Sequence, residues 1–345
     1  ETMLREMRDA AGDSGEFYTP RPVVRFMVTV ADPQLGETVL DPASGTGGFL
    51  VESYNHLAGQ VKTVADRRTL QERSLFGCEP KTLPYLLCQM NLLLHGLDAP
   101  RIDPGNSLRF KLTEIGEKDR VDVIVTNPPF GGEEEKGIQG NFPDDKQTAE
   151  TALLFLQLIM RKLRRKATTI GRPARAAVVV PNGTLCGDGV CARIKEELLK
   201  EFNLHTIVRL PNGVFSPYTS IPTNLLFFDR SGPTKEIWYY EHPLPEGRKN
   251  YTKTQPIQFG EFAECIAWWE KRVENDRAWK VPVGEILKYN GEGRLASVNL
   301  DISNTKGKEH VAHLTPEQLV ASILEKEHRI VEIVGRIKAI LEKQS

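Results

Sequence analysis

The sequence predicts an α/β fold built on a doubly wound, mostly parallel sheet, with an antiparallel last strand and a helical extension at the C-terminal end. Three observations predict this class. Short apolar or β-branched runs alternate with helical patterns between residues 38 and 228, the last two runs are joined by a helix-poor loop, and a seven-residue apolar repeat follows residue 316. A chain of 345 residues can hold one large α/β domain and an appendage.

The predicted strands and helices alternate along the chain. We expect strands at residues 38–41, 75–79, 121–126, 176–180, 206–210 and 225–229, and helices at residues 46–57, 83–94, 149–163 and 189–201. The connection 211–222 is rich in Pro, Gly and Ser and has no helical pattern. Because a parallel crossover usually runs through a helix, the last two strands are predicted to be antiparallel.

The pattern changes after Arg230. Aromatic strand-like residues at 238–240 and a helix with two tryptophans indicate an accessory segment at residues 231–312. From about residue 316 a long helix is expected, in which Ile323, Ile330 and Ile337 recur every seventh position. We interpret residues 313–345 as a coiled-coil-like partner helix, and a helix folded back on its own domain remains the alternative.

Composition and charge set broad limits on the class of protein. The net charge is −1 and the pI about 6.8, so electrostatics alone do not indicate a nucleic-acid-binding protein. Five cysteines without a CxxC pair argue against a disulfide framework or a zinc knuckle. No apolar run approaches the ~18 residues of a membrane span. We therefore expect a soluble protein of a reducing, intracellular compartment.

A glycine-rich turn follows the first predicted strand, where residues 39–49 read VLDPASGTGGF. Glycines in such a turn let backbone N–H groups approach a ligand near the positive end of a helix dipole. The spacing matches neither GxGxxG nor the GK[ST] ending of a phosphate loop, so dinucleotide and phosphate sites are disfavoured. The candidate ligand-binding residues of this turn are Asp41, Ser44, Gly45, Thr46 and Gly47.

Two further elements belong to the same predicted edge of the sheet. Glu79 ends the second strand, where open α/β sheets bind ligands and where a carboxylate can accept two ribose hydroxyls, and a solvated acid is the alternative. Upstream, residues 16–22 read EFYTPRP, in which Thr19 and the prolines are typical of a helix start.

Residues 122–130 read DVIVTNPPF and form a buried strand that stops at two prolines. Neither proline offers an N–H group and both restrict the backbone, so a carbonyl can point outward, unpaired by the sheet. A proline-terminated strand with an aromatic plug would be the purely structural explanation. The candidate catalytic residues are Asn127, Pro128, Pro129 and Phe130.

Taken together, EFYTPRP, DPASGTGGF and NPPF, with VPNG at 180–183 and LPNGVF at 210–215, resemble the modification (M) subunit of type I restriction-modification systems, a family of adenine-N6 DNA methyltransferases. The resemblance implies a Rossmann-like, S-adenosylmethionine-dependent methyltransferase domain at residues 15–230. Residues 1–14 would be the remnant of an N-terminal helical region. It further implies a specificity (S) subunit and DNA as partners, a restriction (R) subunit and a second M subunit in the complex, no membrane contact, and the cytoplasm of a prokaryotic cell.

The resemblance also implies roles for the candidate residues. The Asn127 side-chain oxygen and the Pro128 carbonyl would accept hydrogens from adenine N6 and Phe130 would stack on the flipped base, without a metal. In the cofactor site, Asn106 would recognise the adenine, although many relatives carry Asp there and a turn residue is the alternative. The other residues assigned to the cofactor are Glu16, Phe17, Tyr18, Thr19, Pro20, Asp41, Ser44, Gly45, Thr46, Gly47, Glu79 and Ser107.

Some alternatives remain open. Methylation of a protein glutamine or of a base in RNA would use the same NPP-aromatic device, and a cofactor-binding scaffold without catalysis would keep the fold. A basic cluster at residues 161–175 contacts either phosphates or solvent. The Gly- and Glu-rich segment 131–147 is predicted to be mobile until DNA binds.

Overall fold

The computed structural model describes residues 18–304 and Glu327. The chain divides into two compact units, residues 1–304 and 305–345. Residues 1–14, which were predicted to be the remnant of a helical region, lie outside the described residues, as do Glu16, Phe17 and all of the predicted C-terminal helix except Glu327. Every element named below belongs to the first unit.

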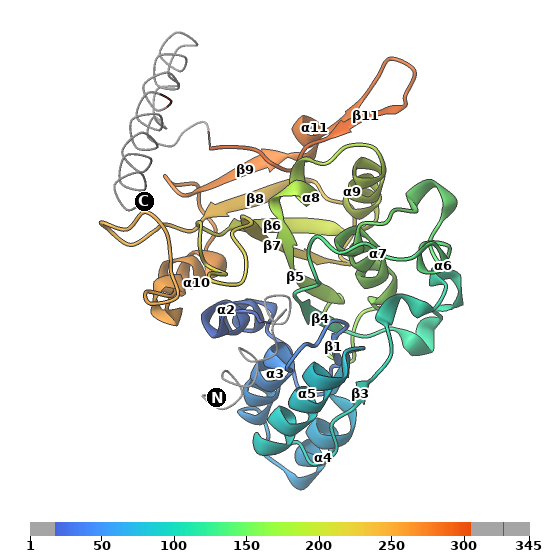
Figure 1. Ribbon diagram of the computed structural model, residues 1–345, viewed down its shortest axis with the longest axis vertical. Helices are drawn as coiled ribbons and strands as arrows, with labels where there is room; N and C mark the ends of the chain where they lie inside the picture. The colour runs from blue at the N-terminus through green and yellow to red at the C-terminus, as the bar shows by residue number, and fades with distance from the viewer. Residues whose placement is uncertain (1–17, 305–326, 328–345) are drawn as a thin grey trace, which may run out of the picture. The chain divides into compact units, whose positions relative to one another are not determined.

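A nine-stranded sheet runs through this unit in the order β3-β2-β1-β4-β5-β7-β6-β8-β9 (Figure 1). The pairs β1–β2, β2–β3, β1–β4, β4–β5 and β6–β8 are parallel, whereas β7 is antiparallel to β5 and β6, and β9 is antiparallel to β8. The strands are β1 (Val39–Asp41), β2 (Leu75–Cys78), β3 (Ile102–Asp103), β4 (Val123–Thr126), β5 (Arg175–Pro181), β6 (Asn203–Arg209), β7 (Thr223–Asp229), β8 (Glu236–Glu241) and β9 (Ala278–Pro282).

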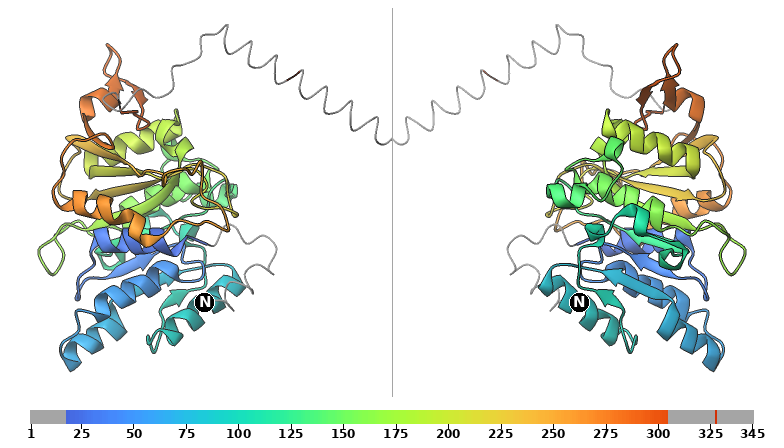
Figure 2. Two further views of the ribbon diagram at one scale, coloured as in Figure 1. Left: turned by 90° about the vertical axis from the view of Figure 1, so that its left-hand side faces the viewer. Right: turned by 90° about the vertical axis from the view of Figure 1, so that its right-hand side faces the viewer.

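The mostly parallel sheet and the antiparallel pairing of residues 206–210 with 225–229 are therefore confirmed. Strands β8 and β9 extend the same sheet beyond Arg230, which was not predicted from the sequence. The boundary predicted at that residue stays a prediction. A separate antiparallel pair, β10 (Leu287–Tyr289) and β11 (Leu295–Val298), lies beyond β9 (Figure 2).

Helices cover both faces of the sheet because its strands carry apolar side chains on both sides. In β5, Ala177 and Val179 join one buried cluster while Val178 and Val180 join another. Such strands read as continuous apolar runs. The first face holds α2 (Arg21–Ala31), α3 (Gly48–Ala58), α4 (Val64–Arg73), α5 (Thr82–Leu94) and α10 (Ala263–Glu270), and the second holds α7 (Thr151–Lys162) and α9 (Val190–Glu201).

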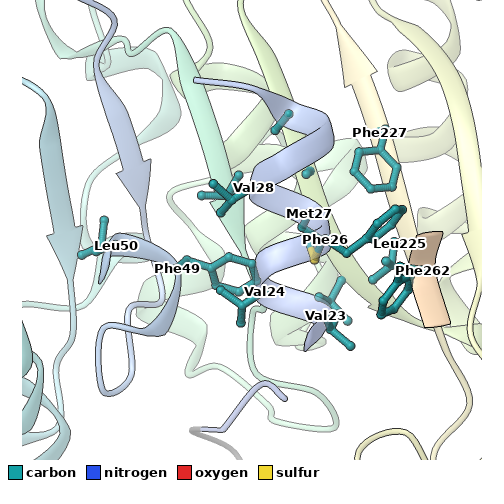
Figure 3. Close-up of a cluster of buried hydrophobic side chains, with 14 of the residues drawn as sticks. Val23, Val24, Phe26, Met27, Val28, Phe49, Leu50, Leu225, Phe227 and Phe262 are labelled. Carbon is teal, nitrogen blue, oxygen red and sulfur yellow. The ribbon is translucent and has the colours of Figure 1, made fainter. Parts of the chain in front are cut away.

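Helix α2 brings the EFYTPRP segment against the core. Pro20 is its N-cap residue and Pro22 lies in its first turn, where the missing N–H groups cost nothing. One face of the helix is fully buried, and Phe26 stacks on Phe262 with ring centroids 4.5 Å apart (Figure 3). The Arg21 Nη1 donates to the Gly48 carbonyl at 3.1 Å, which fixes the start of α2 beside the start of α3.

The apolar periodicity of the sequence did not predict helix α4 (Val64–Arg73), because Leu70 is its only buried residue. A capping box starts it: Thr63 Oγ1 accepts from the Asp66 N–H at 3.1 Å and the Asp66 carboxylate accepts from the Thr63 N–H at 2.9 Å. The other α-helices within residues 18–304 are short: α6 (Lys136–Gln139), α8 (Asn182–Cys186) and α11 (Val283–Ile286). None of the helices that the structure describes is long and apolar enough to cross a membrane.

Replacing Thr63 with alanine is expected to lower the free energy of unfolding by about 1 kcal/mol, because the first turn of α4 loses its cap. Urea denaturation followed by circular dichroism measures the change. Thr69→Ala is the matched control, since Thr69 lies within α4 and its hydroxyl donates only to the carbonyl one turn back. An equal loss in both variants would contradict the role assigned to the cap.

Candidate active site

A cavity of about 650 Å³ opens at the carboxyl ends of β1, β2 and β4. After β1 the chain continues to β2 and β3 on one side of β1, whereas β4 lies on its other side. The cavity therefore lies where the strand order reverses, which is the usual ligand site of open α/β sheets. The predicted residues that line it are Tyr18, Thr19, Asp41, Ser44, Gly45, Thr46, Glu79, Asn106, Ser107, Asn127 and Pro129. Pro20, Gly47, Pro128 and Phe130 are not among the lining residues.

The glycine-rich turn depends on two residues in the left-handed region. Gly45 has φ 51° and Gly47, the N-cap of α3, has φ 83°. A Cβ atom on Gly47 would lie 2.8 Å from the Cys88 Sγ of α5. Gly47 therefore supports the site by allowing α5 to pack closely, although it does not itself face the cavity.

Asp41 is a buried carboxylate that is only half satisfied. Its Oδ1 accepts from Thr126 Oγ1 at 2.7 Å and from the Ala43 N–H at 3.1 Å. Its Oδ2 is buried and has no hydrogen-bond partner among the described residues. Burial raises the pKa of Asp41 to about 7, and the negative charge of Glu79 adds to this. A cationic group in the cavity would satisfy Oδ2 and restore the ionised form.

Glu79 is held at the end of β2 by backbone groups from two elements. Its Oε2 accepts from the Gly45 N–H at 3.0 Å and its Oε1 accepts from the Lys81 N–H at 2.9 Å. Each carboxylate oxygen has capacity for a second hydrogen bond. The side chain is 5% exposed and lines the cavity, so it can accept from hydroxyl groups of a ligand there.

Asn106 and Ser107 also line the cavity, and both side chains make hydrogen bonds within the fold. The Asn106 Oδ1 accepts from the Leu108 N–H at 2.8 Å, and the Ser107 hydroxyl donates to the Pro42 carbonyl at 2.6 Å. The Asn106 oxygen is thus engaged in its own turn, as the turn-residue alternative expects. Its part in adenine recognition stays a prediction.

Asn127 lies directly after β4, at the cavity wall. Its Nδ2 donates to Thr19 Oγ1 at 2.9 Å, and its Oδ1 is buried without a hydrogen-bond partner in residues 18–304. A buried acceptor left unpaired costs about 1–3 kcal/mol, which a donor on a ligand would recover. Phe130 is half-buried and packs against the hydrophobic cluster on the α2 face of the sheet, so its stacking role stays a prediction.

The segment after NPPF forms a wall that the sequence reading did not assign. The cavity is also lined by Gly132, Glu133 and Glu134, and by Thr151 and Phe155 of α7. The Glu134 N–H donates to the Ala149 carbonyl at 2.8 Å, which joins the segment to the start of α7. The Gly131-Gly132 pair is the signal for such an approach, since a Cβ on Gly132 would lie 3.0 Å from Thr151 Oγ1. The mobility of this segment before DNA binding stays a prediction.

Asn91 is another residue that the sequence reading missed. It lines the cavity from α5, and its Nδ2 donates to the Thr46 carbonyl at 2.9 Å. The available signal was an amide three and four residues after the apolar Cys88 and Leu87, on the buried face of the helix.

Several arginines of the basic cluster form ion pairs within the fold. Arg175 forms a two-point pair with the fully buried Glu37 at 2.8–2.9 Å. Arg164 pairs with the buried Asp122 at 2.7 Å. These contacts favour a structural role for these two arginines over phosphate binding. No group of three or more potential metal ligands occurs in the part of the chain that the structure describes.

Comparisons with known proteins agree with this geometry. The sequence model of a family described as N-6 DNA Methylase matches residues 1–312. The chain is 50% identical to the type I restriction enzyme EcoEI methylase subunit of Escherichia coli, over 99% of this chain and 68% of that protein. It is 31% identical to the type I restriction enzyme EcoKI methylase subunit of Escherichia coli strain K12, over 69% of this chain and 46% of that protein.

Solved structures give the same relationship. The fold matches a modification subunit of a putative type I restriction enzyme from Vibrio vulnificus YJ016 with a TM-score of 0.84 and 71% identity, over 88% of this chain and 63% of that one. It matches a chain from a study of type I R-M system assembly with a TM-score of 0.81 and 43% identity, over 100% of this chain and 70% of that one. The chain therefore spans 46% to 70% of the length of these four relatives.

Proposed function

The chain belongs to the N-6 DNA methylase family, and from this premise we propose that it transfers a methyl group from S-adenosylmethionine to N6 of a flipped adenine in DNA, as the modification subunit of a type I restriction-modification complex. The observation that carries the proposal is the unpaired, buried Oδ1 of Asn127 in the same cavity as Asp41 and Glu79.

Asn127 supplies what a weak amine nucleophile needs. The lone pair of adenine N6 is delocalised into the ring, and acceptors for its two hydrogens favour a tetrahedral nitrogen. The Asn127 Oδ1 serves as one acceptor, and the Pro128 carbonyl serves as the second. The Asn127 amide nitrogen is held by Thr19, so its oxygen is the free end. Because an adenine inside a duplex cannot reach this cavity, the base must flip out.

The residues in the cavity fit S-adenosylmethionine. When bound, this cofactor supplies an electrophilic sulfonium methyl group. Asp41 Oδ2 is an unpaired anionic acceptor suited to its ammonium group, and Glu79 is an acceptor suited to its ribose hydroxyls. Tyr18, Thr19 and residues of the glycine-rich turn line the same cavity.

The partners that we propose for the chain follow from its family and from its net charge. With a net charge of −1 and two arginines of its basic cluster engaged in internal ion pairs, the chain does not offer an evidently cationic DNA surface. We propose that a specificity subunit supplies base readout and much of the phosphate contact, and that a second M subunit and the restriction subunit complete the complex. The relatives named above favour DNA over protein or RNA as the substrate.

Transfer of a labelled methyl group to unmethylated DNA tests the proposal. We expect label in N6-methyladenine when the cognate specificity subunit is present, and at most weak transfer when it is absent. DNA already methylated at its target sites is the control and should accept no label. Label that enters protein or RNA without the specificity subunit would support the alternative substrate, and no transfer to DNA under either condition would rule out the proposal.

A further inference from the structure

We infer that Thr19 is a positioning residue that orients the amide of Asn127, and that it does so when its hydroxyl hydrogen is taken by an anionic group bound in the cavity. Through this contact, the target amine would be captured at one end of the cavity only when a ligand is bound at the cofactor end. The inference rests on the proposed function. It gives Thr19 a role beyond simple cofactor contact.

An asparagine amide has two ends of nearly the same shape and opposite hydrogen-bonding character. The oxygen accepts, whereas the NH₂ group only donates. An exocyclic amine also brings hydrogens, so it needs the oxygen end. If the Asn127 amide turned by 180° about its last torsion, donors would face donors and the target amine would be repelled. The site therefore requires a device that selects one of two orientations.

Thr19 is the residue placed to select it. Its Oγ1 lies 2.9 Å from Asn127 Nδ2, across 108 residues of sequence. Both partners stand on well-packed elements: Thr19 directly precedes the N-cap of α2, whose Val23 and Val24 are fully buried, and Asn127 directly follows β4. The core therefore sets the distance between these two side chains.

The hydroxyl of Thr19 does not select an orientation by itself, because a hydroxyl can either donate or accept. Toward Asn127 Oδ1 it would donate, and toward Nδ2 it accepts. The described structure gives this hydroxyl no hydrogen-bond partner other than Asn127, and Thr19 lines the cavity. Its hydrogen is therefore available to a ligand.

A bound carboxylate removes the ambiguity. The methionine carboxylate of S-adenosylmethionine is an acceptor only, so a Thr19 hydroxyl that donates to it can only accept from Asn127. Nδ2 must then face Thr19, and Oδ1 must face the target amine. A separate side-chain contact links the two sites, since the Thr126 hydroxyl donates to Asp41 Oδ1 at 2.7 Å and so ties the strand end before Asn127 to the cofactor site.

The test uses the assembled complex of the chain with its specificity subunit and a duplex that carries 2-aminopurine at the target position. Fluorescence reports base flipping, and titrations with and without saturating sinefungin, a cofactor analogue without a transferable methyl group, give the coupling between the two ends. For the wild type we expect sinefungin to strengthen capture of the flipped base about tenfold, the effect of one hydrogen bond.

Thr19→Val keeps the shape of the side chain and removes the hydroxyl. We expect it to abolish the coupling and to lower the single-turnover rate about tenfold even at saturating cofactor, while Thr19→Ser restores both. Thr69→Val, at a half-buried position of α4 outside the cavity lining, is the control and should match the wild type. Sinefungin binding by each variant, measured by calorimetry, establishes that the site is folded.

Coupling within twofold of the wild type in Thr19→Val would overturn the inference, as would a Thr19→Ser variant as impaired as Thr19→Val. These outcomes differ from failure of the proposed function. In that case the wild-type complex itself would transfer no methyl group to DNA.

Discussion

Asn127→Ala is expected to lower the rate of methyl transfer to DNA about 1,000-fold, the upper end of the loss seen when one preorganised polar group of a transition-state site is removed. The variant loses the acceptor that favours a tetrahedral N6, because Asn127 Oδ1 is the unpaired oxygen at this wall of the cavity. Cofactor affinity should change little, since Asp41 and Glu79 remain in place with their own hydrogen bonds.

Single-turnover transfer with saturating cofactor measures the rate, and calorimetry with sinefungin measures cofactor binding. Asn250→Ala is the matched control, because Asn250 is an exposed loop residue that does not line the cavity, and its rate should stay within twofold of the wild type. Transfer by Asn127→Ala at more than a tenth of the wild-type rate would show that another group prepares the nucleophile. A large loss of sinefungin affinity would instead show that the substitution damages the cofactor site.

Much of the sheet was predictable from local pattern, because strands buried on both faces read as unbroken apolar runs. Residues 176–180 and 225–229 were predicted as strands, and the structure has Arg175–Pro181 and Thr223–Asp229. The helix-poor loop between β6 and β7 predicted their antiparallel pairing correctly. Helix α4 escaped because a helix with one buried residue has no apolar stripe, and only the Thr63 and Asp66 capping box marked its start.

The extension of the sheet by β8 and β9 was not predictable in the same way. Trp238, Tyr239 and Tyr240 indicate a strand. Which strand it pairs with in the sheet is decided by contacts with residues that are distant in sequence. The parallel pairing of β8 with β6 joins Thr206 to Trp238 and Arg209 to Glu241. Periodicity carries no information on such a choice.

The candidate site shows the same division. Motifs predicted which residues gather at the carboxyl edge, since Asp41 ends a parallel strand and Glu79 and Asn127 each directly follow one. They did not reveal what each atom contacts. The contact of Thr19 with Asn127 and the unpaired Oδ2 of Asp41 depend on side-chain packing between separate elements. The wall at Gly132 to Glu134 depends on how one loop returns to α7.

Asp41→Asn is expected to weaken cofactor binding about 10- to 100-fold at neutral pH, the range for loss of a hydrogen bond to a charged group. The buried Oδ2 of Asp41 has no partner among the described residues and is the anionic acceptor available to the cofactor ammonium. Asparagine keeps the shape and can still accept from Thr126 and from the Ala43 N–H. It replaces the anionic acceptor Oδ2 with an NH₂ group, which only donates. Calorimetric titration with sinefungin measures the loss, and Asn250→Asp, which adds a charge at an exposed residue outside the cavity lining, should bind like the wild type.

The same carboxyl group makes cofactor binding depend on pH. In the free protein its pKa is raised above the ordinary 3.8 to about 7, mainly by burial and further by Glu79. Its contribution to folding stability is therefore fully present below the unfolded pKa near 4 and is lost as the pH rises through 7. Binding a cation favours the ionised form, so binding releases a proton below pH 7.

Sinefungin affinity of the wild type should accordingly rise by up to about tenfold per pH unit as the pH approaches 7, and level off above it. Asp41→Asn should show no such rise, whereas Glu79→Gln should keep it with its midpoint moved to lower pH, because the nearby negative charge is gone. Proton release, obtained from titrations in buffers of different ionisation enthalpy, should vanish in Asp41→Asn. If the affinity of the wild type for sinefungin stays constant across this range, Asp41 is already ionised in the free protein. Binding of the ammonium group would then release no proton from Asp41.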